Sequence, residues 1–262
     1  MNDVELAIAL VREGAAIVRR DFGTTVSRLD KGGGDFATST DVGAEAAMLA
    51  VLRGERPRDA VRGEESGQRG AGDSARRWLI DPLCGTLNYA AGMQVVAVNA
   101  ALSTPDGVIA AAVADPFADF ILWADRNSAW LRTGAGDSAA APSSRSALVD
   151  LNLDPPFPNA TRFRAVTLMA ETGFAARFRP RVVSSTLAVA WVASGQRAAY
   201  VTDGDVRESV HFSAGIAICE AAGCVVTDLA GASWESGANG LIAAANQDAH
   251  AALIELVAEQ LR

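Results

Sequence analysis

Three groups of acidic side chains stand out, because carboxylates are the ligands that a hard cation such as Mg²⁺ prefers in proteins. Asp41 ends the run ThrSerThrAsp, Glu64 and Glu65 stand in GlyGluGluSer, and Asp81 follows an apolar run. A cation held by such groups can orient and acidify a water molecule. Taken singly, each acid also has a structural explanation, as a helix N-cap, as solvated loop charges and as the end of a strand.

In combination, the acidic runs resemble the motifs of the inositol monophosphatase superfamily. Residues 81–86, AspProLeuCysGlyThr, are similar to the family's Asp-Pro-x-Asp-Gly-Thr, and residues 63–66 lie upstream near the spacing of its Gly-Glu-Glu motif. Residues 38–41 match an earlier Thr-x-Thr-Asp, and Lys31 is placed like a lysine of many members. Residues 209–231 resemble a late segment of the family that begins Trp-Asp-x-Ala-Ala-Gly. Four matches in order, over nearly the whole chain, identify it as a member.

The resemblance implies Mg²⁺-dependent hydrolysis of a small phosphomonoester of the sugar, inositol or nucleotide type. It implies that Glu64 and Asp81 bind the first ion, together with the backbone carbonyl of Leu83. Thr86, with Glu64, would hold the attacking water. Asp41 would act near a third, weaker ion or on the same water.

The resemblance also implies substrate contacts. Gly85 and Thr86 would open a helix whose free N–H groups receive phosphate oxygens. Ser185 stands in a SerSerThr run that resembles the turn with which relatives hold substrate hydroxyls. Asp205 falls near the acid that grips a polyol in relatives, although extra residues leave its register open between Asp203, Asp205 and Glu208.

Two departures from the family pattern affect the second metal. Cys84 stands where the motif has its second Asp, and Phe212, preceded by His211 in place of Trp, stands where the late motif has its Asp. Of the usual carboxylates of that ion, only Asp81 remains. Because cysteine suits softer metals and phenylalanine offers no lone pair, the ordinary second Mg²⁺ site should be absent. We therefore expect phosphatase activity by the standard mechanism to be severely impaired, since each ~1.4 kcal/mol of transition-state stabilisation is worth tenfold in rate.

Two interpretations of the altered positions stay open. Cys84 and Phe212 either fill the space that a metal vacated, as buried free cysteines commonly do, or Cys84 and His211 form a thiolate–imidazole pair or a Zn²⁺ site. Cys219 and Cys224 are interpreted as core residues.

The apolar patterns indicate which elements position these residues. Residues 3–22 and 44–52 predict helices, and residues 78–80 predict a short buried strand that ends at Asp81-Pro82. Residues 66–76 predict an exposed loop, and several β-like runs from 95 to 130 predict an antiparallel meander. Residues 134–146 read as a linker or a long hairpin end.

The second half alternates between strand and helix patterns, which indicates layered α/β packing. Strands are predicted near 147–152, 181–184, 198–202, 224–228 and 240–245, and helices near 161–174, 186–194, 213–222 and from 248. The predicted fold class is α/β, or layered α+β, and the resemblance implies alternating helix, sheet, helix, sheet and helix layers with a larger antiparallel N-terminal sheet. We expect an N-terminal lobe, 1–140, and a C-terminal lobe, 147–262, that share one core.

Composition narrows the classes of partner. The chain has 262 residues and a formal net charge of −8, which argues against nucleic-acid binding. Three scattered cysteines, the lack of a signal-peptide pattern and the lack of a long apolar run predict a cytoplasmic protein without a membrane partner. The resemblance implies a homodimer whose small-molecule partner is a phosphorylated metabolite.

Three functions therefore compete. The first is a phosphatase with a reduced set of metal ions. The second is a non-hydrolytic descendant that binds a phosphorylated ligand or supports a partner. The third is a repurposed catalyst that uses Cys84 and His211.

Overall fold

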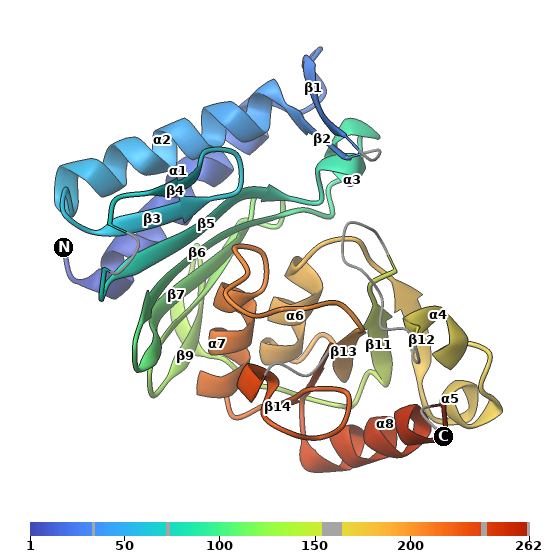
Figure 1. The fold of residues 1–262 in the computed structure, drawn as a ribbon. Coiled ribbons are helices and arrows are strands. Elements are labelled where there is room, and N and C mark those ends of the chain that lie inside the picture. The colour runs from blue at the N-terminus through green and yellow to red at the C-terminus, as the bar shows by residue number, and fades with distance from the viewer. Residues whose placement is uncertain (33–34, 72–73, 154–163, 237–239, 261–262) are drawn as a thin grey trace. The chain divides into compact units, whose positions relative to one another are not determined.

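A computed structural model describes residues 1–32, 35–71, 74–153, 164–236 and 240–260. The chain divides into two compact units (Figure 1). Unit 1 comprises Met1–Ala139, Ser185–Leu187 and Glu208–Ile218, and unit 2 comprises Ala140–Ser184, Ala188–Arg207 and Cys219–Arg262. Mixed helices and sheets confirm the predicted α/β class.

Unit 1 is built on an eight-stranded sheet in the order β10-β9-β8-β7-β6-β5-β3-β4. Every neighbouring pair is antiparallel except β3 and β5, which run parallel. The meander predicted between residues 95 and 130 is confirmed as strands β6 to β9, and the region expected to be a linker contributes β10. The strands are β3 (Ala60–Gly63), β4 (Gly67–Arg69), β5 (Arg77–Cys84), β6 (Ala97–Thr104), β7 (Gly107–Asp115), β8 (Phe120–Asp125), β9 (Ala129–Thr133) and β10 (Gly136–Ala139).

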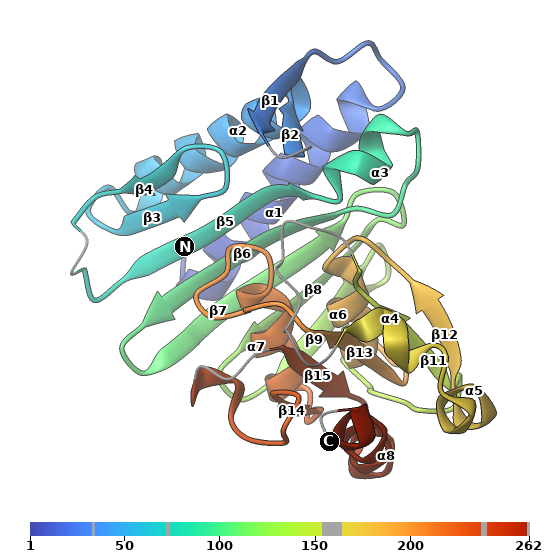
Figure 2. The same cartoon turned by 45° about the vertical axis from the view of Figure 1, so that its right-hand side comes forward.

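Two long helices cover one face of this sheet (Figure 2). Helix α1 (Asp3–Asp21) begins with a capping box at Asn2, and helix α2 (Ser39–Glu55) begins with one at Thr38. The hairpin of β1 (Arg28–Gly32) and β2 (Asp35–Thr38) joins them. Helix α2 starts earlier than predicted, because Thr38 caps it and Asp41 occupies the third helical position. Asp41 is therefore not the N-cap residue that its position in the sequence suggested.

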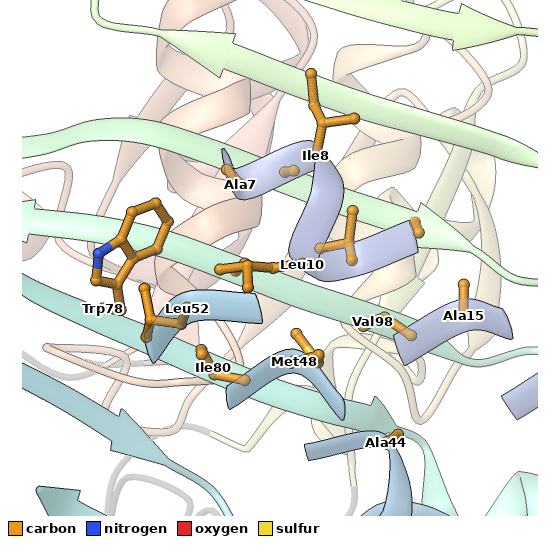
Figure 3. Close-up of a cluster of buried hydrophobic side chains, with 14 of the residues drawn as sticks. Ala7, Ile8, Leu10, Ala15, Ala44, Met48, Leu52, Trp78, Ile80 and Val98 are labelled. Carbon is orange, nitrogen blue, oxygen red and sulfur yellow. The ribbon is translucent and has the colours of Figure 1, made fainter. Parts of the chain in front are cut away.

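The core of unit 1 lies between these helices and the sheet. Leu10 of α1 and Met48 of α2 meet Trp78 and Ile80 of β5 and Val98 of β6, all fully buried (Figure 3). Alternate residues of β5 and β6 point into this layer because side chains along a strand face opposite sides of the sheet. The residues between them face the other side, where Asp81 and Asn99 pair across β5 and β6.

Strand β5 is longer than predicted. Pairing with β6 continues beyond Asp81-Pro82 to Cys84, with an irregular register between Asp81 and Cys84. Proline is tolerated at such an irregularity because a ladder hydrogen bond is already missing there. The five-residue helix α3 (Thr86–Ala90) follows at once.

Unit 2 contains a five-stranded sheet in the order β12-β11-β13-β15-β14. Strand β11 runs parallel to β12 and β13, and β15 runs antiparallel to β13 and β14. The strands are β11 (Leu148–Leu151), β12 (Arg179–Val182), β13 (Ala199–Thr202), β14 (Val225–Thr227) and β15 (Leu241–Ala244). The helical elements of the second half of the chain are α4 (Ala165–Leu168), α5 (Thr172–Arg177), α6 (Leu187–Ala193), α7 (Ser213–Ala221), the 3₁₀ turn η1 (Trp234–Ser236) and α8 (Gln247–Gln260). The first residue of α6 and the first six residues of α7, 213–218, belong to unit 1.

Apolar side chains of α5 and α8 form a second cluster with this sheet, including Phe174, Leu253 and Val257. The predicted strands and helices of this half correspond to observed elements, with one difference. The helix predicted near 161–174 is two short helices, α4 and α5, and its first residues lie outside the described part of the chain. The division into lobes 1–140 and 147–262 that share one core stays a prediction. Among the described helices, none is both long enough and apolar enough to cross a membrane.

The close packing of α1 against α2 and β6 at Gly14 can be tested by substitution. A Cβ atom at Gly14 would lie 2.8 Å from Cγ1 of Val98 and 2.9 Å from the sulfur of Met48, whereas one at Gly54 of α2 would meet nothing within 4 Å. We expect Gly14→Ala to lower the free energy of unfolding by about 1–3 kcal/mol through overpacking. Gly54→Ala should be neutral or slightly stabilising, because alanine favours helix more than glycine does. Urea denaturation of both variants checks this, and equal effects would contradict it.

Candidate active site

The irregular end of β5 gathers the predicted site residues in unit 1. Asp81 is fully buried, and its Oδ1 accepts a hydrogen bond from the N–H of Leu83 at 3.1 Å, which closes a local turn. Gly85 then adopts a φ of 105°, in the left-handed region that favours glycine, and serves as the N-cap of α3. This turn brings the carbonyl of Leu83 and the hydroxyl of Thr86 to one side, with the hydroxyl 3.2 Å from the carbonyl oxygen.

Asp41 joins this turn from the start of α2. Its Oδ1 accepts a hydrogen bond from Oγ1 of Thr86 at 2.8 Å, and its Oδ2 accepts from both the N–H and the hydroxyl of Thr38. Burial raises the pKa of Asp41, and the hydrogen bonds from Thr38 and Thr86 work against that rise. Because the Thr86 hydroxyl uses its proton in the hydrogen bond to Asp41, its lone pairs remain able to accept a hydrogen bond from a water molecule.

Glu64 lies close enough to Asp81 for the two carboxyl groups to interact. Burial raises the pKa of Glu64 well above its ordinary value, and the negative charge of Asp81 raises it further. Nζ of Lys31, on β1, lies 3.3 Å from Oε1 of Glu64 and 2.7 Å from Oε1 of Glu65. Although burial works to lower it, the pKa of Lys31 is raised by these two carboxylates.

His211 forms an ion pair with Asp81. Nδ1 of His211 lies 2.8 Å from Oδ2 of Asp81, and because an ionised carboxylate can only accept, Nδ1 is the donor. Burial of each group works against its charge, yet the pKa of His211 is raised well above its ordinary value and that of Asp81 is lowered, because each stabilises the charged form of the other. The fully buried Asn99 adds a second donor to Oδ2 of Asp81, at 3.2 Å.

Cys84, another altered position, lies beside Asp81 and His211. Sγ of Cys84 accepts a hydrogen bond from the N–H of Thr186 at 3.3 Å, and the carbonyl of Cys84 accepts one from the hydroxyl of Ser185 at 3.1 Å. Burial raises the pKa of Cys84, and the negative charge of Asp81 adds to that rise. Phe212 is fully buried.

Two residues of this site were missed by sequence reasoning. Glu45 on α2 accepts hydrogen bonds from the N–H groups of Glu65 and Ser66, at 2.8 and 2.9 Å, and so holds the loop that carries Glu64. Asn99 links Asp81 to Oγ1 of Thr186, at 3.0 Å. Each had a signal, since Glu45 follows Asp41 by one helical turn and Asn99 is the one polar residue in the run ValValAlaValAsnAlaAlaLeu.

Asp205, the predicted substrate contact, belongs to unit 2. It accepts hydrogen bonds from the N–H of Arg207, at 3.1 Å, and from its guanidinium group, at 3.0 and 3.2 Å. These bonds lower the pKa of Asp205. The predicted role of Asp205 toward a substrate stays a prediction.

The oxygen atoms beside Glu64 fit a hard cation. Oε2 of Glu64 is a buried atom without a hydrogen-bond partner among the described residues, and a buried carboxylate oxygen of this kind costs free energy unless something pairs with it. The carboxylate of Asp81 and the carbonyl of Leu83 lie on the same turn, which gives an all-oxygen set of the kind that Mg²⁺ prefers. The side chains of Cys84 and Phe212 do not suit Mg²⁺, because neither offers an oxygen.

A separate cavity of about 260 Å³ lies in unit 1 against α1 and strands β7, β8 and β9. Arg19 and Arg132 contribute to its lining, and each is paired with an aspartate, Asp119 and Asp137 respectively. This cavity contains none of the site residues described above and plays no part in the chemistry considered below.

The sequence matches the model of the inositol monophosphatase family over residues 2–262. The chain belongs to this family. It is 26% identical over 263 residues to an inositol-1-monophosphatase of Caulobacter vibrioides, in a match that covers 95% of this chain and 98% of the relative.

Another relative is a glucose-1-phosphate thymidylyltransferase of Streptomyces griseus, 34% identical over 143 residues, and that match spans about half of either chain, 54% of this one and 55% of the relative. Among solved structures, an IMPase of Thermotoga maritima superposes with a TM-score of 0.84 over 100% of this chain and 98% of the other. At 21% identity, this likeness shows the shared fold alone.

The hydrogen bonds from the loop to Glu45 predict that this residue is needed for the stability of unit 1. We expect Glu45→Ala to lower the free energy of unfolding by about 3 kcal/mol, because hydrogen bonds to charged groups contribute roughly 1.5–3 kcal/mol each and two are lost. The exposed Glu13 of α1 provides the control Glu13→Ala, which should have little effect. Chemical denaturation followed by circular dichroism measures both. A loss at Glu45 no larger than that at Glu13 would contradict the anchoring role.

Proposed function

We propose that this protein is a phosphoric monoester hydrolase that acts on a small phosphorylated sugar, inositol or nucleotide-type metabolite. The observation that carries the proposal is the convergence of Glu64, Asp81, the Leu83 carbonyl and Thr86 in one unit, on a chain of the inositol monophosphatase family. Family membership supports the reaction class, and the side-chain geometry supports the assignment of roles.

Glu64, Asp81 and the carbonyl of Leu83 would hold one Mg²⁺ ion. When bound, the ion supplies a Lewis acid that makes a coordinated water more acidic and offsets the charge of the phosphate. Lys31 balances the negative charge of Glu64 from the other side. Oε2 of Glu64 would then find the partner that the described residues do not provide.

The chain's own residues position the attacking water. Oγ1 of Thr86 donates a hydrogen bond to Asp41, so its lone pairs can accept a hydrogen bond from water. Glu64, which lies within hydrogen-bond distance of Lys31, is proposed to hold the attacking water together with Thr86 and to take the proton that this water loses. Asp41 fixes the Thr86 hydroxyl and is in turn fixed by Thr38.

Substrate would enter with its phosphate at the turn of Gly85 and Thr86, where the first N–H groups of α3 have no partner within the helix. Ser185 and Asp205 are proposed to contact the remainder of the substrate. We also propose a cytoplasmic homodimer, on the strength of the family resemblance and the cysteine pattern.

A second candidate function follows from the altered residues. Cys84 and Phe212 provide no oxygen for a second Mg²⁺. The imidazole of His211 places a positive charge beside Oδ2 of Asp81. A protein that keeps phosphate binding and loses turnover would have these properties. The two functions differ in one observable, which is steady release of phosphate.

The direct test is phosphate release from a panel of sugar, inositol and nucleotide monophosphates with Mg²⁺. We expect turnover by the native chain, and we expect Asp81→Asn to reduce it at least about a hundredfold, because the variant loses the charge that binds the cation. Circular dichroism should first confirm that Asp81→Asn is folded. If the native chain releases no more phosphate than this variant on every substrate, it is not a hydrolase of this kind.

Thr86 offers a second prediction, on water positioning alone. Thr86→Val keeps the shape of the side chain and removes the hydroxyl. We expect kcat to fall at least about tenfold and KM to change little, since the hydroxyl acts on the water more than on the substrate. Thr24→Val is a suitable control, because its hydroxyl donates to a backbone carbonyl at the end of α1, away from the site. A change confined to KM would place Thr86 in substrate binding instead.

A further inference from the structure

Three side chains with different donor atoms meet at the altered end of the site. One oxygen of Asp81, the sulfur of Cys84 and one ring nitrogen of His211 all lie within 4.8 Å of one another. Two come from the end of β5 and the third from the segment that leads into α7, so the cluster depends on the fold of unit 1. The cluster does not lie on the open surface, since Asp81 is fully buried and the other two residues are partly buried.

The donor set distinguishes this cluster from a Mg²⁺ site. Carboxylate, imidazole and thiolate are together the ligands of Zn²⁺ and of the chemically similar ions Co²⁺ and Fe²⁺, whereas Mg²⁺ prefers oxygen alone. Three protein ligands with one further position are the usual arrangement of a catalytic zinc site. Ligand distances of about 2.0–2.3 Å in a tetrahedron set ligand–ligand separations of about 3.5 Å, so small movements of the side chains would suffice.

The residues around the cluster hold its donors in place. The N–H of Thr186 donates to Sγ of Cys84, and the side chain of Asn99 bonds both to Asp81 and to Thr186. An N–H directed at sulfur stabilises the thiolate form that binds a metal. Hydrogen bonds from such surrounding groups orient ligands and tune their affinity.

We propose that Asp81, Cys84 and His211 form a binding site for one ion of the Zn²⁺, Co²⁺ or Fe²⁺ class. The ion replaces the proton between His211 and Asp81 and the thiol proton of Cys84, and both protons pass to solvent. Ion binding at this cluster stands independently of turnover. The ion would stand where relatives place a second Mg²⁺ and would support phosphate hydrolysis there. This part of the inference rests on the proposed function.

The same geometry makes Cys84 a poor nucleophile. Burial and the nearby Asp81 raise the pKa of the thiol, whereas reactive cysteines have lowered pKa values. A bound ion deprotonates a thiol that coordinates it, so this rise opposes attack by a metal-free Cys84 more than it opposes metal binding by the same residue.

Cobalt provides a direct probe, because a thiolate bound to Co²⁺ gives an intense charge-transfer absorption that oxygen and nitrogen ligands do not give. We expect the purified full chain, kept reduced with a phosphine, to bind one Co²⁺ per chain with this absorption. Zn²⁺ should abolish the band by competition, and excess Mg²⁺ should leave it unchanged. His211→Gln should weaken Co²⁺ affinity at least about tenfold, since even the loss of a group outside the ligand set commonly costs that much.

The chain supplies matched controls for the cysteine. Cys84→Ser should lose the band, whereas Cys219→Ser and Cys224→Ser, which change the other free cysteines, should keep it. Cys84→Asp should still bind Co²⁺ without the band, which separates loss of the sulfur from loss of folding. Phosphate release with Mg²⁺ is measured separately, so failure of the proposed function would leave a positive cobalt result intact.

Two results would overturn the proposal. The first is no Co²⁺ binding by the native chain at micromolar concentrations of the ion. The second is a charge-transfer band that survives in Cys84→Ser, since another cysteine would then be the ligand. Either result would mean that Cys84 and His211 serve only to fill space and to balance the charge of Asp81.

Discussion

The carboxylate of Asp81 has no exposure to solvent, and the structure of the site follows from how its charge is balanced. A buried carboxylate is costly unless charged or polar partners surround it. Here the partners are the N–H of Leu83, the amide of Asn99 and the imidazole of His211. They fix the turn between β5 and α3, and this turn positions the Leu83 carbonyl and the Thr86 hydroxyl. The neighbouring Glu64, with its raised pKa, reflects the same concentration of negative charge.

The residues around Asp81 that differ from the family motif change how its negative charge is balanced. Relatives with the full motif are expected to place a carboxylate at the position of Cys84 and another at Phe212, and metal ions would balance them. In this chain both carboxylates are missing, and His211 supplies a positive charge through a side chain. His211 therefore balances the charge of Asp81 within the protein itself. A softer ion that takes the place of the shared proton would preserve the same balance, because Cys84 becomes negative as the ion binds.

The scaffold positions these groups by ordinary packing. Alternation along β5 and β6 sends Trp78, Ile80 and Val98 toward the two long helices and leaves Asp81 and Asn99 on the opposite face. Helix α2 contributes at its start through Asp41 and one turn later through Glu45, which holds the loop of Glu64. One sheet and one helix therefore support most of the site, and the remaining contacts come from short segments around Ser185 and His211.

Local patterns in the sequence determined the meander, the two N-terminal helices and the alternation of the second half, because periodicity reports which face of an element is buried. The motifs likewise singled out Asp41 and Asp81, which the structure places near the end of β5. The sequence could not show that β5 continues past Pro82, since pairing with β6 stabilises it, nor that Glu45 and Asn99 belong to the site. It also left open whether His211 faces Cys84 or merely replaces a tryptophan. Only the tertiary structure brought residues 81, 84 and 211 together, because contacts between distant segments depend on the packing of whole elements and leave no local pattern.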